Sequence, residues 1–180
     1  MSLPGERSEQ DTLARMIRVN HAGEYGAKRI YAGQLAVLGK SEMGPLLRHM
    51  AEQEQEHLDA FEREMRVRRV RPTALMPLWH VAGFALGAAT ALMGKRAAMA
   101  CTVAVESAID EHYAAQEKQL SAMQPRESAL KDNISKFRAD EKEHHDTALQ
   151  HDAEQAPLYS LLTSAIVYKT KLAIWLSTRI

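Results

Sequence analysis

Apolar positions along this 180-residue chain recur at helical rather than strand spacing. Long stretches combine that spacing with good helix formers, and few β-branched runs are bounded by turn residues. The pattern predicts main helices over residues 13–38, 46–69, 95–123 and 127–155, and a last helix from Leu158 onward. Gly39, Gly44 and Pro45 separate the first two helices, and Pro125 separates the next two. An all-α bundle is therefore expected.

The segment at residues 71–94 does not fit that alternation of apolar and polar positions. After Arg71 its only titratable residue is His80, so the question of a membrane span arises. Pro72, Pro77 and three glycines disfavour one uninterrupted helix, and an arginine-rich stretch precedes the segment. We expect a broken segment lying in the plane of a bilayer interface, with burial in the protein as the alternative.

The C-terminal segment at residues 157–180 is also mostly apolar. Lys169, Lys171 and Arg179 interrupt it, and cations make deep insertion into lipid expensive. An interfacial helix can keep these cations at the lipid headgroups. We therefore expect residues 71–94 and 157–180 to associate with a membrane surface, unless they bury one another in a soluble dimer or core.

Composition narrows the class of protein. With 46% hydrophobic and 26% charged residues, the chain is globular rather than disordered, and its length suits one domain. We assign residues 15–180 to that domain and residues 1–14 to a poorly ordered tail. A formal net charge of zero argues against a nucleic-acid partner. Cys101 is the only cysteine, which excludes an intrachain disulfide and thiolate metal clusters.

No secretory or organellar targeting pattern is visible at the N-terminus. A cytoplasmic bacterial chain is the simplest interpretation, and a processed organellar chain is the alternative.

Two short acidic motifs repeat each other. Residues 54–57 read Glu-Gln-Glu-His and residues 141–144 read Glu-Lys-Glu-His, so Glu-x-x-His occurs twice. Positions i and i+3 share one helix face, whereas Glu56 and Glu143 project away from it. A single motif of this kind would most often be a surface pair.

Each motif also has a mirrored glutamate on the preceding predicted helix. Glu24 and Glu54 are equally distant from Gly39 at the first turn, and Glu106 and Glu141 are equally distant from the sequence just before Pro125. In two antiparallel hairpins these glutamates would stand level with the motifs. The sequence therefore predicts one cluster of six side chains: Glu24, Glu54, His57, Glu106, Glu141 and His144.

Four carboxylates and two imidazoles form the ligand set of carboxylate-bridged di-iron or di-manganese bundles. The carboxylates nearly neutralise two divalent cations and can bridge them, and each histidine supplies one nitrogen. Buried without metal, the carboxylates would repel one another and raise each other's pKa, at a cost of several kcal/mol.

The remaining histidines and two tyrosines are weaker candidates. His49, His145 and His151 lack partners in the repeat, so His144 rather than His145 is the expected ligand. Tyr31 and Tyr113 each follow a mirrored glutamate by seven residues, on the same face and roughly 10 Å further along the helix. We interpret Tyr31 as a core residue. His112 and Tyr113, beside the third glutamate, suggest a substrate pocket.

Five stretches carry a resemblance to a known family: RVNHAGEYGAKRIYAGQLAVLG, EQEHLDAF, RVRPTALMPLWHVAGFALGAATALMGK, ACTVAVE and DEKEHHDTALQHDAEQAP. Together they closely resemble the demethoxyubiquinone hydroxylase family of ubiquinone biosynthesis. The similarity runs from about Arg15 to the C-terminus, and none of the six ligand positions is substituted. The first fourteen residues carry no part of it.

The resemblance implies a ferritin-like four-helix bundle with an apolar crossover and an additional C-terminal helix. It implies a membrane-associated monooxygenase that uses O2 to hydroxylate C5 of 2-polyprenyl-3-methyl-6-methoxy-1,4-benzoquinol. Two iron ions would be bridged by Glu54 and Glu141, with Glu24 and Glu106 mainly terminal. His112 and Tyr113 would adjoin the quinone or its electron path.

The resemblance also implies a place in the cell and leaves partners open. The protein would be peripheral, on the cytoplasmic side of a bacterial inner membrane or the matrix side of the mitochondrial one. NADH, a reductase, or the substrate as intermediary could each deliver electrons. Other ubiquinone-biosynthesis proteins or a second copy of the chain are candidate protein partners.

Two other functions remain as alternatives. A ferritin-like iron-oxidising or storage protein, or a peroxide-reducing bundle, needs the same ligands but no hydrophobic ring pocket or membrane surface. The apolar crossover, the arginines before it and the apolar last helix argue against that class. A metal-free assembly subunit is disfavoured by the intact ligand set.

Overall fold

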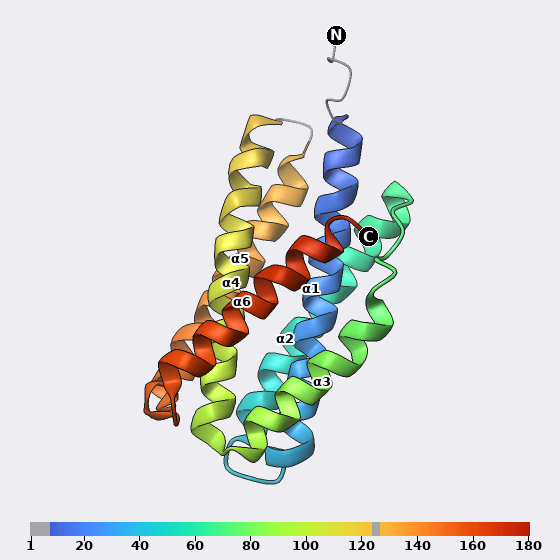
Figure 1. Cartoon of the computed structure of the whole chain (residues 1–180). Helices are drawn as coiled ribbons and strands as arrows, with labels where there is room; N and C mark the ends of the chain where they lie inside the picture. Colours follow the sequence, from blue (N-terminus) through green and yellow to red (C-terminus); the bar gives the residue numbers. More distant parts are fainter. Residues whose placement is uncertain (1–7, 124–126) are drawn as a thin grey trace.

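The computed structural model of the protein describes residues 8–123 and 127–180, and every regular element in these ranges is helical. Six α-helices and one short 3-10 helix follow in order, as Figure 1 shows: α1 Glu9–Leu38, α2 Gly44–Arg68, α3 Met76–Leu92, α4 Lys95–Ala122, α5 Ser128–Gln150, η1 Ala153–Gln155 and α6 Tyr159–Ser177. The expected all-α bundle is confirmed.

Two antiparallel hairpins form the bundle. Helices α1 and α2 pack as one hairpin, and α4 and α5 pack as the other. Helix α3 lies along α1, and α6 runs obliquely across α4 and also contacts α1 (Figure 1). The bundle core therefore lies between the two hairpins, while α3 and α6 cover one side of it.

A local signal explains the start of the first helix. Ser8 caps α1 by accepting a hydrogen bond from the Asp11 amide at 3.0 Å, so α1 starts at Glu9 and Leu13 is buried. Residues 9–14, which the sequence places in the tail, are thus helical. Residues 1–7 of that tail and Pro125 lie outside the described residues. Helix α5 ends at Gln150, five residues earlier than predicted.

The apolar crossover is not broken as the sequence pattern predicts. Helix α3 is continuous from Met76 to Leu92, with Pro77 in its first turn, where no backbone donor is lost. Its glycines serve close packing against α1 instead. A Cβ atom at Gly87 would collide with the carbonyl oxygen of Ile30, and one on Gly33 of α1 would collide with that of Phe84. Tertiary contact therefore outweighs the weak helix propensity of glycine here.

Candidate metal centre

Six acidic and histidine side chains meet in the middle of the bundle, each at most 2% exposed. Helices α1 and α4 supply one glutamate each, and α2 and α5 supply one Glu-x-x-His pair each. The side chains are those that the sequence predicts to cluster: Glu24, Glu54, His57, Glu106, Glu141 and His144.

These side chains form two overlapping groups of four, and within each group the potential ligand atoms lie within 4.8 Å of one another. Glu54 and Glu141 belong to both groups. Glu24 and His57 complete one group, and the other is completed by Glu106 and His144. Two shared carboxylates between two incomplete shells are the arrangement that two bridged cations require.

The imidazoles point their Nδ1 atoms into the cluster. His57 Nδ1 lies 3.4 Å from Glu24 Oε2 and 3.2 Å from Glu141 Oε1. His144 Nδ1 lies 3.4 Å from both Glu54 Oε1 and Glu141 Oε2. Each histidine therefore offers one nitrogen beside the two shared carboxylates.

Buried polar atoms without hydrogen-bond partners concentrate in this cluster. Each of the six residues has at least one such atom, and both oxygens of Glu54 and of Glu141 are among them. Elsewhere in the described ranges the only others are His21 Nδ1 and Gln34 Oε1. Unpaired buried polar atoms are costly, and cations coordinated by these atoms would remove that cost. The donor set thus fits two divalent metal ions.

Two further residues contact the imidazole nitrogens that face away from the cluster. The Nε2 atom of His57 lies 3.1 Å from Asp140 Oδ2, and that of His144 lies 2.9 Å from Gln53 Oε1. Each partner immediately precedes the shared glutamate of the opposite hairpin. Because both partner atoms are acceptor oxygens, these bonds favour the tautomer with the proton on Nε2, in which Nδ1 can bind a metal. Sequence reasoning missed both partners, although their position before each motif was a visible signal.

The two tyrosines contact the cluster across the bundle. Tyr31 Oη donates a hydrogen bond to Glu106 Oε1 at 3.0 Å, and the Tyr113 hydroxyl donates to Glu24. The interpretation of Tyr31 as an ordinary core residue is therefore incomplete. Tyr31 is buried, but its hydroxyl bonds a cluster carboxylate just as that of Tyr113 does.

His112 lies apart from the six clustered side chains. Its Nε2 atom lies 3.0 Å from Asn20 Oδ1 and 2.7 Å from Gln116 Nε2. Its ring centroid is 6.0 Å from that of Tyr113. His112 and Tyr113, which the sequence predicts as a pair, are therefore adjacent but have different partners. Tyr113 bonds Glu24, whereas His112 contacts the amides of Asn20 and Gln116, which sequence reasoning missed.

Burial and mutual repulsion dominate the electrostatics of the metal-free cluster. Burial and the charge of Glu141 raise the pKa of Glu54 and of Glu106 well above the ordinary range. Burial opposes protonation of His57, but the neighbouring carboxylates of Glu141 and Glu24 outweigh it and raise its pKa to about 11. Without metal, protons therefore take over part of the charge balance that cations would provide.

Residues predicted to lie off the cluster do so. Glu56 and Glu143 are exposed, as are His49 and His151. The His145 side chain is 28% exposed and its Nδ1 lies 3.0 Å from Asp146 Oδ1.

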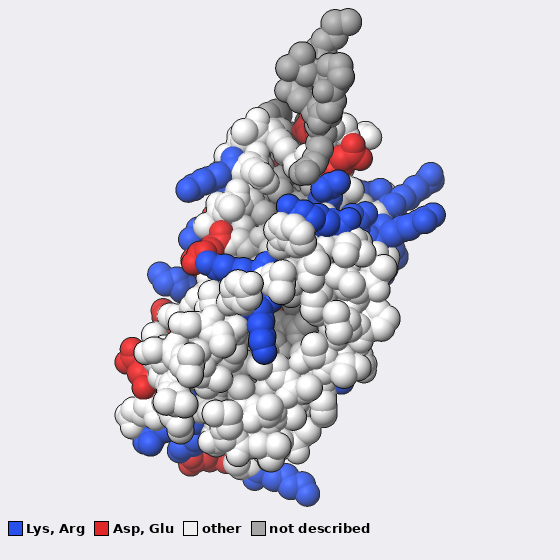
Figure 2. Space-filling view, in the orientation of Figure 1, with Lys and Arg blue, Asp and Glu red and all other residues white. Residues whose placement is uncertain are grey.

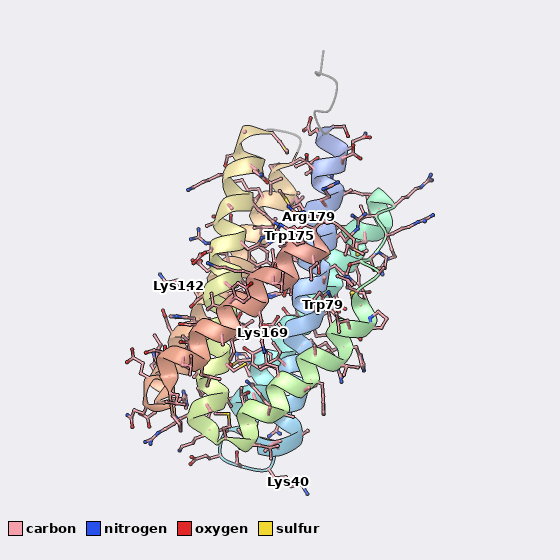
Figure 3. All side chains as sticks on the ribbon, viewed as in Figure 1. Lys40, Trp79, Lys142, Lys169, Trp175 and Arg179 are labelled. Atoms are coloured by element: carbon pink, nitrogen blue, oxygen red, sulfur yellow. The ribbon has the colours of Figure 1, made fainter. Side chains whose placement is uncertain are left out.

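One side of the molecule is strongly apolar. We call the exposed apolar side chains of α3 and α6 the apolar face; Figure 2 shows it as a broad area with few charged groups, hollowed between the two helices. Lys169 of α6 and Arg179, just beyond the end of α6, lie on this side, and Arg179 stacks 4.0 Å over the Trp175 ring (Figure 3). Among the described helices, none is both long and apolar enough to span a bilayer. The apolar face comprises Leu78, Val81, Phe84, Leu92, Leu161, Tyr168, Leu172 and Trp175.

Comparison with known proteins gives consistent matches. Residues 11–177 match the family model described as ubiquinone biosynthesis protein COQ7. The human mitochondrial NADPH-dependent 3-demethoxyubiquinone 3-hydroxylase is 56% identical over 167 residues, which cover 92% of this chain and 77% of the relative. The 3-demethoxyubiquinol 3-hydroxylase of Rhodospirillum rubrum is 51% identical over 179 residues, covering 99% of this chain and 83% of the relative. The 5-demethoxyubiquinone hydroxylase of Saccharomyces cerevisiae is 43% identical, covering 93% and 78%.

Proposed function

The chain belongs to the COQ7 family of ubiquinone biosynthesis proteins, and we propose that it hydroxylates demethoxyubiquinol with a pair of iron ions held by the six clustered residues. The observation that carries this proposal is the pair of four-residue groups sharing Glu54 and Glu141. That arrangement suits a bridged pair of metal ions, and the relatives are named for this hydroxylation.

The reaction follows from the substrate's substitution pattern. In 2-polyprenyl-3-methyl-6-methoxy-1,4-benzoquinol only C5 carries a hydrogen, so that C–H bond becomes a C–O–H group. One atom of O2 enters the ring, and the other leaves as water after taking up two electrons and two protons. The mammalian relatives are named NADPH-dependent, which supports a reduced nicotinamide dinucleotide as the source of those electrons.

The protein's own residues position what reacts. The iron pair supplies the oxidising power when bound. Glu54 and Glu141 would hold both ions, Glu24 with His57 one of them, and Glu106 with His144 the other. Hydrogen bonds from the tyrosine hydroxyls and from behind the imidazoles fix these side chains before metal arrives. The surrounding buried apolar side chains exclude bulk water from the reacting ring.

We further propose that the apolar face docks on a bilayer. The substrate's polyprenyl tail stays in lipid, and an exposed apolar patch of this extent marks an interaction surface. Lys169 and Arg179, on the same side of the molecule, can reach headgroup phosphates. The hollow between α3 and α6 would admit the ring. The protein would be peripheral, on the cytoplasmic side in a bacterium or the matrix side in a mitochondrion; another ubiquinone-biosynthesis protein or a second copy is the competing occupant.

The decisive experiment is a single turnover with defined components. Iron-loaded protein is reduced without oxygen, mixed with short-tailed demethoxyubiquinol and then exposed to ¹⁸O2. Mass spectrometry should find one labelled oxygen atom in the quinol product and none with Glu54→Ala protein. Oxidation of iron without labelled product would instead support an iron-storage or peroxide-reducing function.

A further inference from the structure

The two hairpins contribute equivalent residues to the six clustered side chains, but the residues around the cluster differ between the two hairpins. The spacing that relates Glu24 to Glu106 also relates Tyr31 to Tyr113, and the tyrosines make equivalent bonds. The same spacing relates Asn20 to Thr102, Ile30 to His112, and Gln34 to Gln116. A feature present in only one half is not required for binding a symmetric metal pair.

The polar group Asn20, His112 and Gln116 is such a feature. Asn20 and Gln116, both buried, pair through their amides: Asn20 Nδ2 donates to Gln116 Oε1 at 2.8 Å, and Gln116 Nε2 donates to Asn20 Oδ1 at 2.7 Å. The second hydrogen of Gln116 Nε2 points to His112 Nε2 at 2.7 Å. Asn20 Oδ1 lies 3.0 Å from the same nitrogen; because the Gln116 contact is the shorter of the two, we assign Nε2 as its acceptor, which places the ring proton on Nδ1.

The equivalent positions of the other half hold no such group. Gln34 donates to the main-chain oxygen of Ala98 at 3.1 Å, and Thr102 Oγ1 donates to the same oxygen at 3.5 Å. Ile30 stands where His112 would be. Gln34 thus joins α1 to the backbone of α4, Thr102 bonds within α4, and neither contacts an imidazole.

The other ring nitrogen of His112 is available. His112 Nδ1 has no hydrogen-bond partner in the described ranges, and it is not among their buried unpaired atoms, so it opens to accessible space. The adjacent Glu111 accepts a hydrogen bond from Lys171 of α6 at 2.6 Å, so this part of α4 lies against the helix that forms half of the apolar face. Burial lowers the pKa of His112 to about 4, so the ring is neutral near pH 7.

We propose that the Asn20–Gln116 amide pair is a positioning device that engages His112 Nε2 and thereby presents its Nδ1–H to an oxygen of the quinone or quinol ring. The inference rests on the proposed function and assigns the substrate's ring to the Asn20 side of the cluster. A neutral donor suits both redox forms, because a carbonyl and a hydroxyl oxygen each accept a hydrogen bond. Asn20 and Gln116 act through His112 and need not touch the substrate.

The test compares two matched glutamines. Gln116→Met and Gln34→Met each remove a buried amide at equivalent positions of the repeat. Binding of short-tailed demethoxyubiquinone to oxidised, iron-loaded protein is measured by equilibrium dialysis. Gln116→Met should raise Kd roughly three- to tenfold, the effect of losing one oriented hydrogen bond, and Gln34→Met should leave it unchanged. Asn20→Thr, which installs the residue found at position 102, should act like Gln116→Met and serves if that variant does not fold.

A spectroscopic readout separates positioning from packing. In zinc-loaded protein, ¹⁵N shifts of His112 should report one neutral tautomer with the proton on Nδ1, and Gln116→Met should convert it to a mixture. Equal Kd for wild type and Gln116→Met, equal weakening by Gln34→Met, or an unchanged tautomer would each overturn the inference. An active wild type with an unaffected variant overturns this inference alone; a wild type that neither binds nor hydroxylates the quinone overturns the proposed function as well.

Discussion

Tyr113 of one hairpin donates its hydroxyl hydrogen to Glu24 of the other, and Tyr31 returns the equivalent bond to Glu106 at 3.0 Å. Both rings are 1% exposed, so neither bond competes with bulk water. The exchanged bonds tie α1 to α4 at the height of the six clustered side chains and orient Glu24 and Glu106, each of which belongs to only one of the two four-residue groups.

Replacing either tyrosine by phenylalanine should therefore destabilise the metal-free protein. Each variant leaves a buried carboxylate oxygen without its donor, which costs about 1–3 kcal/mol. Urea unfolding of metal-free Tyr113→Phe and Tyr31→Phe measures this, and similar losses are expected because the two contacts are equivalent. A loss in one variant only would show that the two halves are not energetically equivalent.

Metal binding should distinguish residues on the cluster face from their neighbours. The protein should hold about two irons per chain. Glu54→Ala or Glu141→Ala should remove most of the metal, because each carboxylate belongs to both groups. Glu56→Ala and Glu143→Ala are matched controls, because each side chain is exposed two residues after a shared glutamate, and these variants should retain the metal. Iron is counted by atomic absorption after gel filtration.

The adjacent histidines provide a further control within the same prediction. His144→Ala should lose iron, whereas His145→Ala should keep it, since His145 bonds Asp146 at the surface. Equal iron loss in all of these variants would mean that the metal is bound elsewhere.

Much of this centre was accessible from the sequence. The six clustered positions follow from two repeated motifs and their mirrored glutamates, because helix geometry and an antiparallel turn fix them. Asp140 and Gln53 stand visibly before each motif, but their contacts with the imidazoles could not be predicted, since they depend on how one hairpin rotates against the other. The continuous α3 was mispredicted because Gly87 acts through its contact with Ile30, and local propensity carries no information about that contact.

Gly87 accordingly offers a stability test of the α1–α3 contact. Gly87→Ala places a methyl group against the Ile30 carbonyl and should destabilise the protein by about 1–3 kcal/mol. Gly26→Ala is the control: a Cβ there meets nothing within 4 Å, so better helix propensity should stabilise by up to about 1 kcal/mol. Thermal unfolding of the two variants should therefore shift in opposite directions. If Gly87→Ala is neutral, α3 does not pack as closely as described.

Metal affinity should rise with pH. Without metal, the pKa of His57 is about 11 and those of Glu54 and Glu106 are raised, so protons occupy ligand atoms at neutral pH. Metal must displace these protons, and lowering the pH therefore favours the metal-free state. Zinc titration in weakly buffered solution with an indicator dye should show proton release at about pH 7. Affinity independent of pH between about 6 and 8 would contradict this account of the cluster's charge.

The apolar face should bind lipid through side chains that the fold itself does not need. Val81 of α3 and Leu161 of α6 are 65% and 67% exposed. Trp79 would be a poor choice for substitution, because its indole N–H donates to Ser177 at 3.0 Å and joins α3 to α6 (Figure 3). The double variant Val81→Glu, Leu161→Glu should keep its iron and its unfolding temperature but lose flotation with anionic liposomes, because inserting charges at these positions into the acyl region is energetically costly.

Val67→Glu is the matched control, since Val67 is 80% exposed on α2 and outside the apolar face, and this variant should float like the wild type. High salt should weaken flotation only partly if apolar contact dominates over headgroup attraction. A wild type that stays in the soluble fraction at every lipid composition would refute membrane docking while leaving the metal centre intact, and a concentration-dependent dimer abolished by the double variant would identify a second copy as the occupant of the face.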